Sequence, residues 1–156
     1  MRKGAILGRT ALIVFLVAGL LVLAYPGYRE SNFPDARGAR ESGHAGMIPA
    51  FIPDAAKDIR TLTNLDTMQH WGCFHLPDGT REFRTHLAAE GAVRREGESL
   101  PKAGKMLGWV TWWPATMSEV GIERYDLHSP ASRGVTMIGL SARDNRVCFY
   151  GGGNAG

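Results

Sequence analysis

Cysteine is scarce in this sequence, which contains only Cys73 and Cys148. Structural zinc sites usually draw four ligands from recognisable pairs of cysteine and histidine, and no second pair lies at a suitable spacing. The sequence therefore predicts no metal site. Neither cysteine directly follows the apolar run near the N-terminus, which excludes a lipoprotein.

An excess of charge is also lacking outside the first 24 residues. The formal net charge is +3 at pH 7, and Arg2, Lys3 and Arg9 account for all of it because acidic and basic residues balance in the remainder. A balanced remainder offers no basic surface to a phosphate backbone. Nucleic acid is therefore not an expected partner.

The familiar signatures of enzymes are missing as well. Gly104-Lys105 looks like the end of a phosphate-binding loop, but Met106 replaces the hydroxyl residue and Ser99 stands where the first glycine belongs. The sequence has no Gly-x-Ser-x-Gly elbow, no His-Glu-x-x-His motif and no dinucleotide fingerprint after a strand, and no pair of carboxylates stands out for acid–base catalysis. We expect no cofactor.

The sequence does contain a long apolar segment at its N-terminus. Arg9 is the only charged residue between Ala5 and Tyr25, and about 20 helical residues span the hydrocarbon layer of a membrane. The basic residues at the start place the N-terminus in the cytoplasm. Residues 1–25 are thus predicted to form a transmembrane anchor, with the rest of the chain exported. A signal peptide cleaved after residues 22–24 is the alternative, whereas a buried helix of a soluble domain would show a polar face.

The composition changes abruptly after this segment. Residues 26–46 are rich in glycine, proline and charged residues, and such a stretch buries too little surface to offset the entropy of ordering. We expect a flexible linker here, with a packed irregular loop as the alternative. Residues 47–150 are expected to form one globular domain, and residues 151–156 a disordered tail.

Periodicity and turn residues outline the elements of that domain. We expect an extended segment over 48–53, one helical turn over 54–57, strands over 59–65 and 70–76, a turn over 77–79, a helix over 80–90, a loop over 91–105 and a hairpin of 134–142 with 146–150. The apolar residues 106–113 suit either a strand or the start of a helix. The predicted fold class is α+β, with a small antiparallel sheet and one or two helices on one of its faces.

A resemblance accompanies this pattern. The run Ile48-Pro49-x-x-Ile52-Pro53-x-x-Ala56-x-Asp58-Ile59, followed by Asn64-x-Asp66-Thr67 and Trp71, resembles the YbbD-head-like group of small, uncharacterised bacterial envelope proteins. The resemblance covers about 25 residues, and Ala55-Ala56 stands where a Ser-Ala pair is common. It implies a membrane-anchored α+β domain of unknown function, without catalytic residues. With the anchor, it implies a single-pass protein of the bacterial inner membrane whose domain is periplasmic.

Four side chains could carry chemistry. His70, Cys73, His75 and His86 provide bases, a nucleophile and metal ligands, although a lone cysteine on an apolar strand is usually a small core residue. Cys73 and Cys148 each fall in a predicted strand, so they form either a disulfide between adjacent strands or two separate buried thiols.

Three tryptophans lie within five positions, at Trp109, Trp112 and Trp113. If this segment is a strand, Trp112 points away from the other two and stays near solvent, where tryptophan favours partner binding. In a helix all three share one side. The alternative to an exposed Trp112 is that all three belong to the core or touch the lipid surface.

Two hypotheses for function follow. The first is a non-enzymatic binding or structural module of the envelope, which contacts an envelope protein through an exposed aromatic surface or sheet edge. The second is a small hydrolase or metal-dependent enzyme that uses His70, Cys73, His75 and His86, and it requires these side chains to converge in a cleft.

Overall fold

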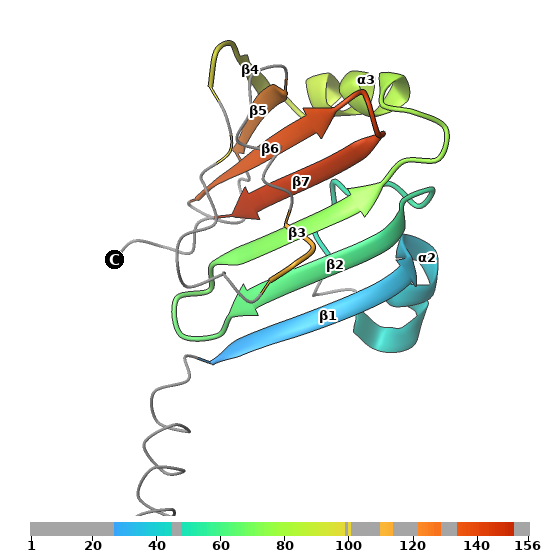
Figure 1. Ribbon diagram of the computed structural model, residues 1–156, viewed down its shortest axis with the longest axis vertical. Coiled ribbons are helices and arrows are strands. Elements are labelled where there is room, and N and C mark those ends of the chain that lie inside the picture. The colour runs from blue at the N-terminus through green and yellow to red at the C-terminus, as the bar shows by residue number, and fades with distance from the viewer. Residues whose placement is uncertain are drawn as a thin grey trace, which may run out of the picture.

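The described residues of the chain form one antiparallel sheet with short helices. The computed structural model describes residues 27–44, 48–98, 100, 110–113, 122–128 and 134–151. The sheet has the strand order β1-β2-β3-β7-β6-β5-β4 (Figure 1). Its strands are β1 (Tyr28–Asp35), β2 (Lys57–Asn64), β3 (His70–His75), β4 (Val93–Arg95), β5 (Glu123–His128), β6 (Val135–Ser141) and β7 (Arg146–Gly151). The helical elements are α2 (Ala36–Ala39), the π-helical turn η1 (Arg40–His44) and α3 (Arg81–Ala89).

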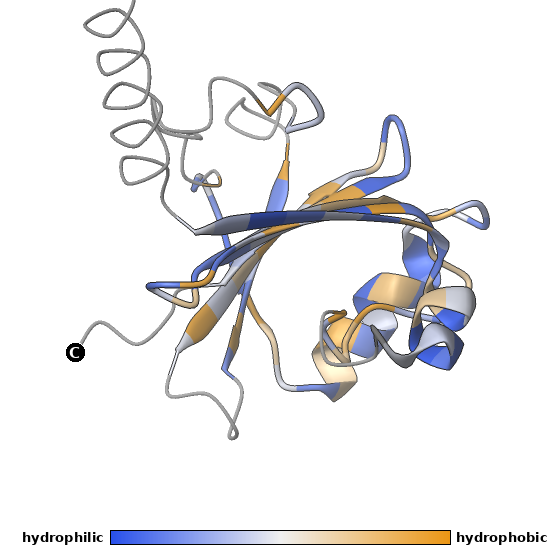
Figure 2. Ribbon diagram, turned by 90° about the horizontal axis from the view of Figure 1, so that it is seen from below, coloured by the Kyte–Doolittle hydropathy of each residue, from blue (hydrophilic) through white to orange (hydrophobic). Residues whose placement is uncertain are grey.

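The helices α2 and α3 lie on one side of the sheet, as Figure 2 shows. The main core lies between this side and the helices, and it contains Phe74 of β3, Phe83 and Leu87 of α3, and Phe149 of β7. We call this face of the sheet the helix face. The predicted α+β class, with an antiparallel sheet and helices on one face, is confirmed.

A second, smaller core lies on the opposite face, which we call the open face. Leu62, Cys73, Val110, Trp113 and Cys148 are all buried there. Alternation along a strand explains the division, because Phe74 and its neighbour Cys73 must point to opposite faces. The central strands are thus buried on both sides, and among the described residues Leu100 and the segment 110–113 cover part of the open face.

The expected flexible linker over residues 26–46 is wrong for residues 28–44. The strand β1 pairs with β2 along its length, from Tyr28 opposite Asn64 to Asp35 opposite Lys57. Phe33 is buried in the helix-face core, and the Asp35 carboxylate accepts a hydrogen bond of 2.7 Å from the backbone N–H of Gly38. The polar composition misleads because an edge strand needs few apolar side chains when its backbone groups find partners in the sheet.

Several expected elements are confirmed. The strands β2 and β3, the helix α3 and the β6–β7 hairpin lie where the sequence places them. Asn145 supplies the positive φ of 50° in the hairpin turn, a geometry that asparagine tolerates well.

Other expectations differ from the structure. Residues 48–56 form turns rather than an extended segment and a helical turn, with the Ile52 N–H donating to the Pro49 carbonyl and the Ala56 N–H to the Pro53 carbonyl. The expected loop over 91–105 contains β4, and β5 was not predicted. Residues 110–113 form a turn and neither a strand nor a helix.

The predicted anchor over residues 1–25 lies outside the described residues. Of the predicted tail over 151–156, the structure describes only Gly151, which is the last residue of β7. Within the part of the chain that the structure describes, no helix is long and apolar enough to cross a membrane.

Candidate binding cleft on the open face

A disulfide lies at the centre of the open face. Cys73 of β3 stands directly opposite Cys148 of β7, with 4.0 Å between their Cα atoms, and the two sulfur atoms are bonded to each other. Directly opposed residues in an antiparallel pair bring their Cβ atoms close enough for such a bond. Cys73 is therefore no free nucleophile or thiolate ligand in this state.

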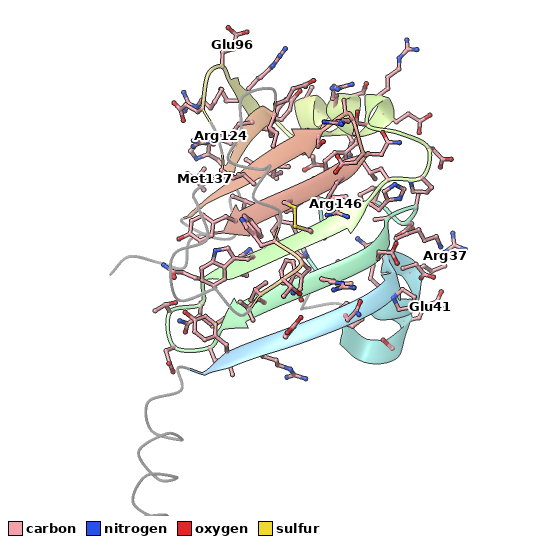
Figure 3. The ribbon with its side chains drawn as sticks, viewed as in Figure 1. Arg37, Glu41, Glu96, Arg124, Met137 and Arg146 are labelled. Carbon is pink, nitrogen blue, oxygen red and sulfur yellow. A yellow bond between two sulfur atoms is a disulfide. The ribbon has the colours of Figure 1, made fainter. Side chains whose placement is uncertain are left out.

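A cleft of about 490 Å³ opens beside this disulfide. Its lining comes from three neighbouring strands and from the segment 110–113, and consists of Asp58, Arg60, Cys73, Phe74, His75, Thr111, Trp112 and Arg146. Figure 3 shows Arg146 near the disulfide. The strand order builds this cleft, because Arg60 faces Cys73 across β2 and β3 while His75 faces Arg146 across β3 and β7.

Arg60 and Arg146 are the distinctive groups of the cleft. Both are exposed, and neither makes a hydrogen bond or an ion pair with a side chain among the described residues. The one carboxylate in the lining is Asp58. Two guanidinium groups thus face a single carboxylate, and the cleft carries a local positive charge in a domain that has no overall excess of it.

Arginines on two other elements, β5 and α3, are paired. Arg124 contacts Asp126 at 3.1 Å and also Glu98, and Arg84 donates to Glu123 at 2.8 and 3.0 Å. The hydrogen bond from Arg84, together with one from a tyrosine hydroxyl, holds the pKa of Glu123 below its ordinary value although burial opposes this. These pairs lie toward the β5 side of the sheet, whereas the two arginines of the cleft have no such partner among the described residues.

Trp112 forms one wall of the cleft. Its indole N–H donates a hydrogen bond of 2.8 Å to the Glu30 carboxylate on β1, so the ring is tied to the sheet edge and half-buried. Trp113 is buried in the open-face core with 8% exposure, and its indole N–H has no partner among the described residues. Trp112 is thus more accessible than Trp113, while Trp109 lies outside the described residues.

The four side chains of the enzyme hypothesis do not converge. His75 lines the cleft on the open face, whereas His70 lies on the helix face, where its ring centroid is 6.0 Å from that of Phe149. Burial lowers the pKa of His70, against a smaller opposing effect of a hydrogen bond with the Met68 backbone. His86 belongs to α3 and lines a separate pocket of about 260 Å³.

The described residues also hold no group of three or more histidine, cysteine, aspartate or glutamate side chains that could bind a metal ion. With Cys73 bonded to Cys148, the described residues contain no assembled nucleophile–base pair from the set of His70, Cys73, His75 and His86. The chemistry that the cleft supports is the binding of an anion.

The first three strands of the sheet resemble a known domain family. Residues 29–75 match the family model of the YbbD head domain. The match confirms the resemblance seen in the sequence, and it runs from β1 to the end of β3. Because it begins at Arg29, it also agrees with the finding that β1 is part of the domain. No curated protein and no solved structure matched the chain.

The YbbD head match contains only one side of the cleft. Asp58, Arg60 and His75 lie within it, whereas Trp112 and Arg146 lie outside it. The disulfide joins the two parts, since Cys73 is inside the match and Cys148 outside. Sequence reasoning missed Arg60 and Arg146 because nothing local shows that β2 and β7 flank the same strand.

Proposed function

We propose that this protein is a non-enzymatic, membrane-anchored binding module of the bacterial envelope, and that its open-face cleft binds an anionic group of an envelope component. The observation that carries the proposal is the pair Arg60 and Arg146, two exposed guanidinium groups beside one cleft that have no ion-pair partner among the described residues. The YbbD head match supports a domain of uncharacterised function and adds no catalytic residue.

The strand spacing suits a single anion. Arg60 on β2 and Arg146 on β7 flank β3, and strands two positions apart are separated by about 10 Å. Arginine side chains are long enough to meet above the intervening strand. A guanidinium group offers parallel N–H donors that match the oxygens of a carboxylate or a phosphate. The indole of Trp112 supplies an apolar wall for the rest of the ligand.

The disulfide supports both the compartment and the rigidity of the site. Disulfides persist mainly in oxidising compartments outside the cytoplasm, which agrees with export of everything after Tyr25. The bridge also ties β3 to β7 under the cleft. The two arginines therefore start from strands whose relative position is fixed, which reduces the entropic cost of binding.

Calorimetric titration of the full chain in detergent micelles tests the anion site. The probes are inorganic phosphate, glucuronate as a carboxylate and glucose as a neutral sugar. We expect heat of binding from phosphate, glucuronate or both, and none from glucose. Arg60→Gln and Arg146→Gln should each weaken binding about tenfold or more, because a hydrogen bond to a charged group contributes about 1.5–3 kcal/mol.

Arg81→Gln is the matched control. Arg81 is an exposed arginine at the start of α3, outside the cleft lining, so its loss removes the same charge without touching the cleft. Equal affinity of the wild-type chain and both cleft variants would contradict the proposal, as would an equal loss in the Arg81→Gln control. Binding of only one probe would assign the ligand class to phosphates or to carboxylates.

A further inference from the structure

The turn between β2 and β3 exposes large apolar side chains. Leu65 is 54% exposed and Met68 is 63% exposed, and Val93 is the only other large hydrophobic residue that is exposed among the described residues. Met68 also has a positive φ of 55°, a conformation in which glycine or asparagine is usual. The turn thus keeps a bulky apolar side chain at a position that disfavours one, which indicates a use for that side chain outside the fold.

The same turn is bonded to the chain just after the N-terminal apolar run. The Leu65 N–H donates to the Gly27 carbonyl at 2.7 Å, and the Gly27 N–H donates to the Asp66 carboxylate at 3.4 Å. Gly27 comes two residues after Tyr25, which ends the apolar run. Even in a fully extended chain, the Cα atoms of these two residues are at most about 7 Å apart. Without a linker between them, the turn must lie close to wherever Tyr25 lies.

Aromatic rings line the open face at this end of the sheet. The ring of Trp71 lies 6.2 Å from that of Tyr28 and 5.4 Å from that of Tyr150, measured between centroids. All three side chains are half-buried. Tyrosine and tryptophan are enriched at membrane–water interfaces, where their rings tolerate an apolar and a wet environment together.

We propose that the β2–β3 turn rests on the lipid surface, with Leu65 and Met68 inserted at the boundary between headgroups and acyl chains and the rings of Tyr28, Trp71 and Tyr150 at headgroup level. The proposal rests on the membrane anchor of the proposed function, which brings Gly27 to the bilayer. The partner is therefore the lipid itself. Burial of the two exposed apolar side chains in the interface drives the contact.

This contact fixes the direction in which the cleft faces. His75 and Arg146 lie at the opposite end of β3 and β7 from the β2–β3 turn. His75 lies five residue steps along the strand from His70, which corresponds to about 17 Å. The strands then hold the anion-binding cleft away from the bilayer, where a component of the envelope can reach it.

Methyl-labelled methionine in the full chain tests the contact. The chain is reconstituted into phosphatidylethanolamine–phosphatidylglycerol nanodiscs whose lipids carry a paramagnetic nitroxide near the headgroup. Asp144→Met adds a reference methyl group in the exposed β6–β7 turn, at the far end of the sheet. We expect loss of the Met68 methyl signal and retention of the reference signal. Leu65→Asp should restore the Met68 signal, because a carboxylate opposes insertion.

Extraction with alkaline carbonate separates this proposal from the anchor. Retention of the chain in the membrane together with an unbroadened Met68 signal overturns the lipid contact and leaves the anchor standing. Release of the chain overturns the anchor, and a Met68 signal that is still broadened then upholds the contact on its own. Equal broadening of the Met68 and reference methyl groups also overturns the proposal, because it shows no preferred orientation.

Discussion

At Gly72 on β3 an aromatic ring lies directly against the strand. It stands opposite Phe149 on β7, whose side chain is fully buried and meets the ring of Phe51 edge-on at 5.3 Å. A Cβ atom at Gly72 would lie 2.3 Å from Cζ and 2.5 Å from Cε1 of Phe149, and 3.0 Å from the carbonyl oxygen of Arg60. Gly72→Ala therefore forces the ring or the strand to move.

The expected cost follows from two opposing effects. Adding a methyl group to a packed core costs about 1–3 kcal/mol. Here the added methyl group would meet the ring of Phe149, which itself packs against Phe51. Replacing glycine by alanine also lowers the conformational entropy of the unfolded chain, which stabilises the fold by about 0.4–1 kcal/mol. We expect Gly72→Ala to lower the free energy of unfolding by roughly 1–2 kcal/mol.

Urea unfolding of the full chain in mild detergent, followed by tryptophan fluorescence, measures this loss. Gly27→Ala is the control, because its Cβ would meet Leu65 at an ordinary 3.5 Å. Combining Gly72→Ala with Phe149→Leu removes the ring atoms that clash, so the double variant should lose at least about 0.5 kcal/mol less than the sum of the single variants. Additive losses, or an unchanged stability of Gly72→Ala, would refute the argument that the ring packs against this glycine.

Three further predictions use the same unfolding assay. Replacing Cys73 and Cys148 together by alanine should cost about 2–5 kcal/mol, because the bridge closes a long loop, and a loss well below this range would contradict a formed disulfide. Trp113→Ala should cost about 3–5 kcal/mol as a core truncation and Trp112→Ala clearly less; equal losses would remove the distinction between the two rings. Burial lowers the pKa of His70 from its ordinary 6.5, so the unfolded chain takes up the proton first and stability falls as pH drops below 6.5. His70→Gln should flatten this decline, and an unchanged slope would contradict it.

The sequence predicted those elements whose signals are local. The turn at residues 77–79 ends β3, and the apolar positions of α3 repeat with helical spacing, as in Phe83 and Leu87. The β6–β7 hairpin carries β-rich residues on both sides of a turn that Asn145 can form. Each of these patterns is complete within a few residues, so no knowledge of the rest of the chain is needed.

The missed strands depend on partners far away in the sequence. β1 is a polar edge strand whose only buried side chain is Phe33, and its backbone is satisfied by β2. β4 has three residues, all exposed, and it exists because β5 supplies its hydrogen bonds. Rules based on composition or alternation assign such segments to loops, because they measure burial within the segment and not pairing with another strand.

The candidate cleft was predictable only in fragments. Cys73, His75 and Trp112 attracted attention as unusual residue types, and all three line the cleft. Arg60 and Arg146 look like ordinary solvated charges until the order β2-β3-β7 places them on either side of one strand. Whether an arginine lies close to a carboxylate depends on how the strands are ordered in the folded sheet, and residue spacing in the sequence does not predict that order.

Amide chemical-shift mapping of the ¹⁵N-labelled chain, titrated with phosphate or glucuronate, tests the central claim most directly. The account predicts that the amides that shift lie around Asp58–Arg60, Cys73–His75 and Arg146, on the open face, while those of α3 stay in place. Shifts confined to α3 and the helix face, or no shifts at concentrations that saturate the calorimetric signal, would contradict it.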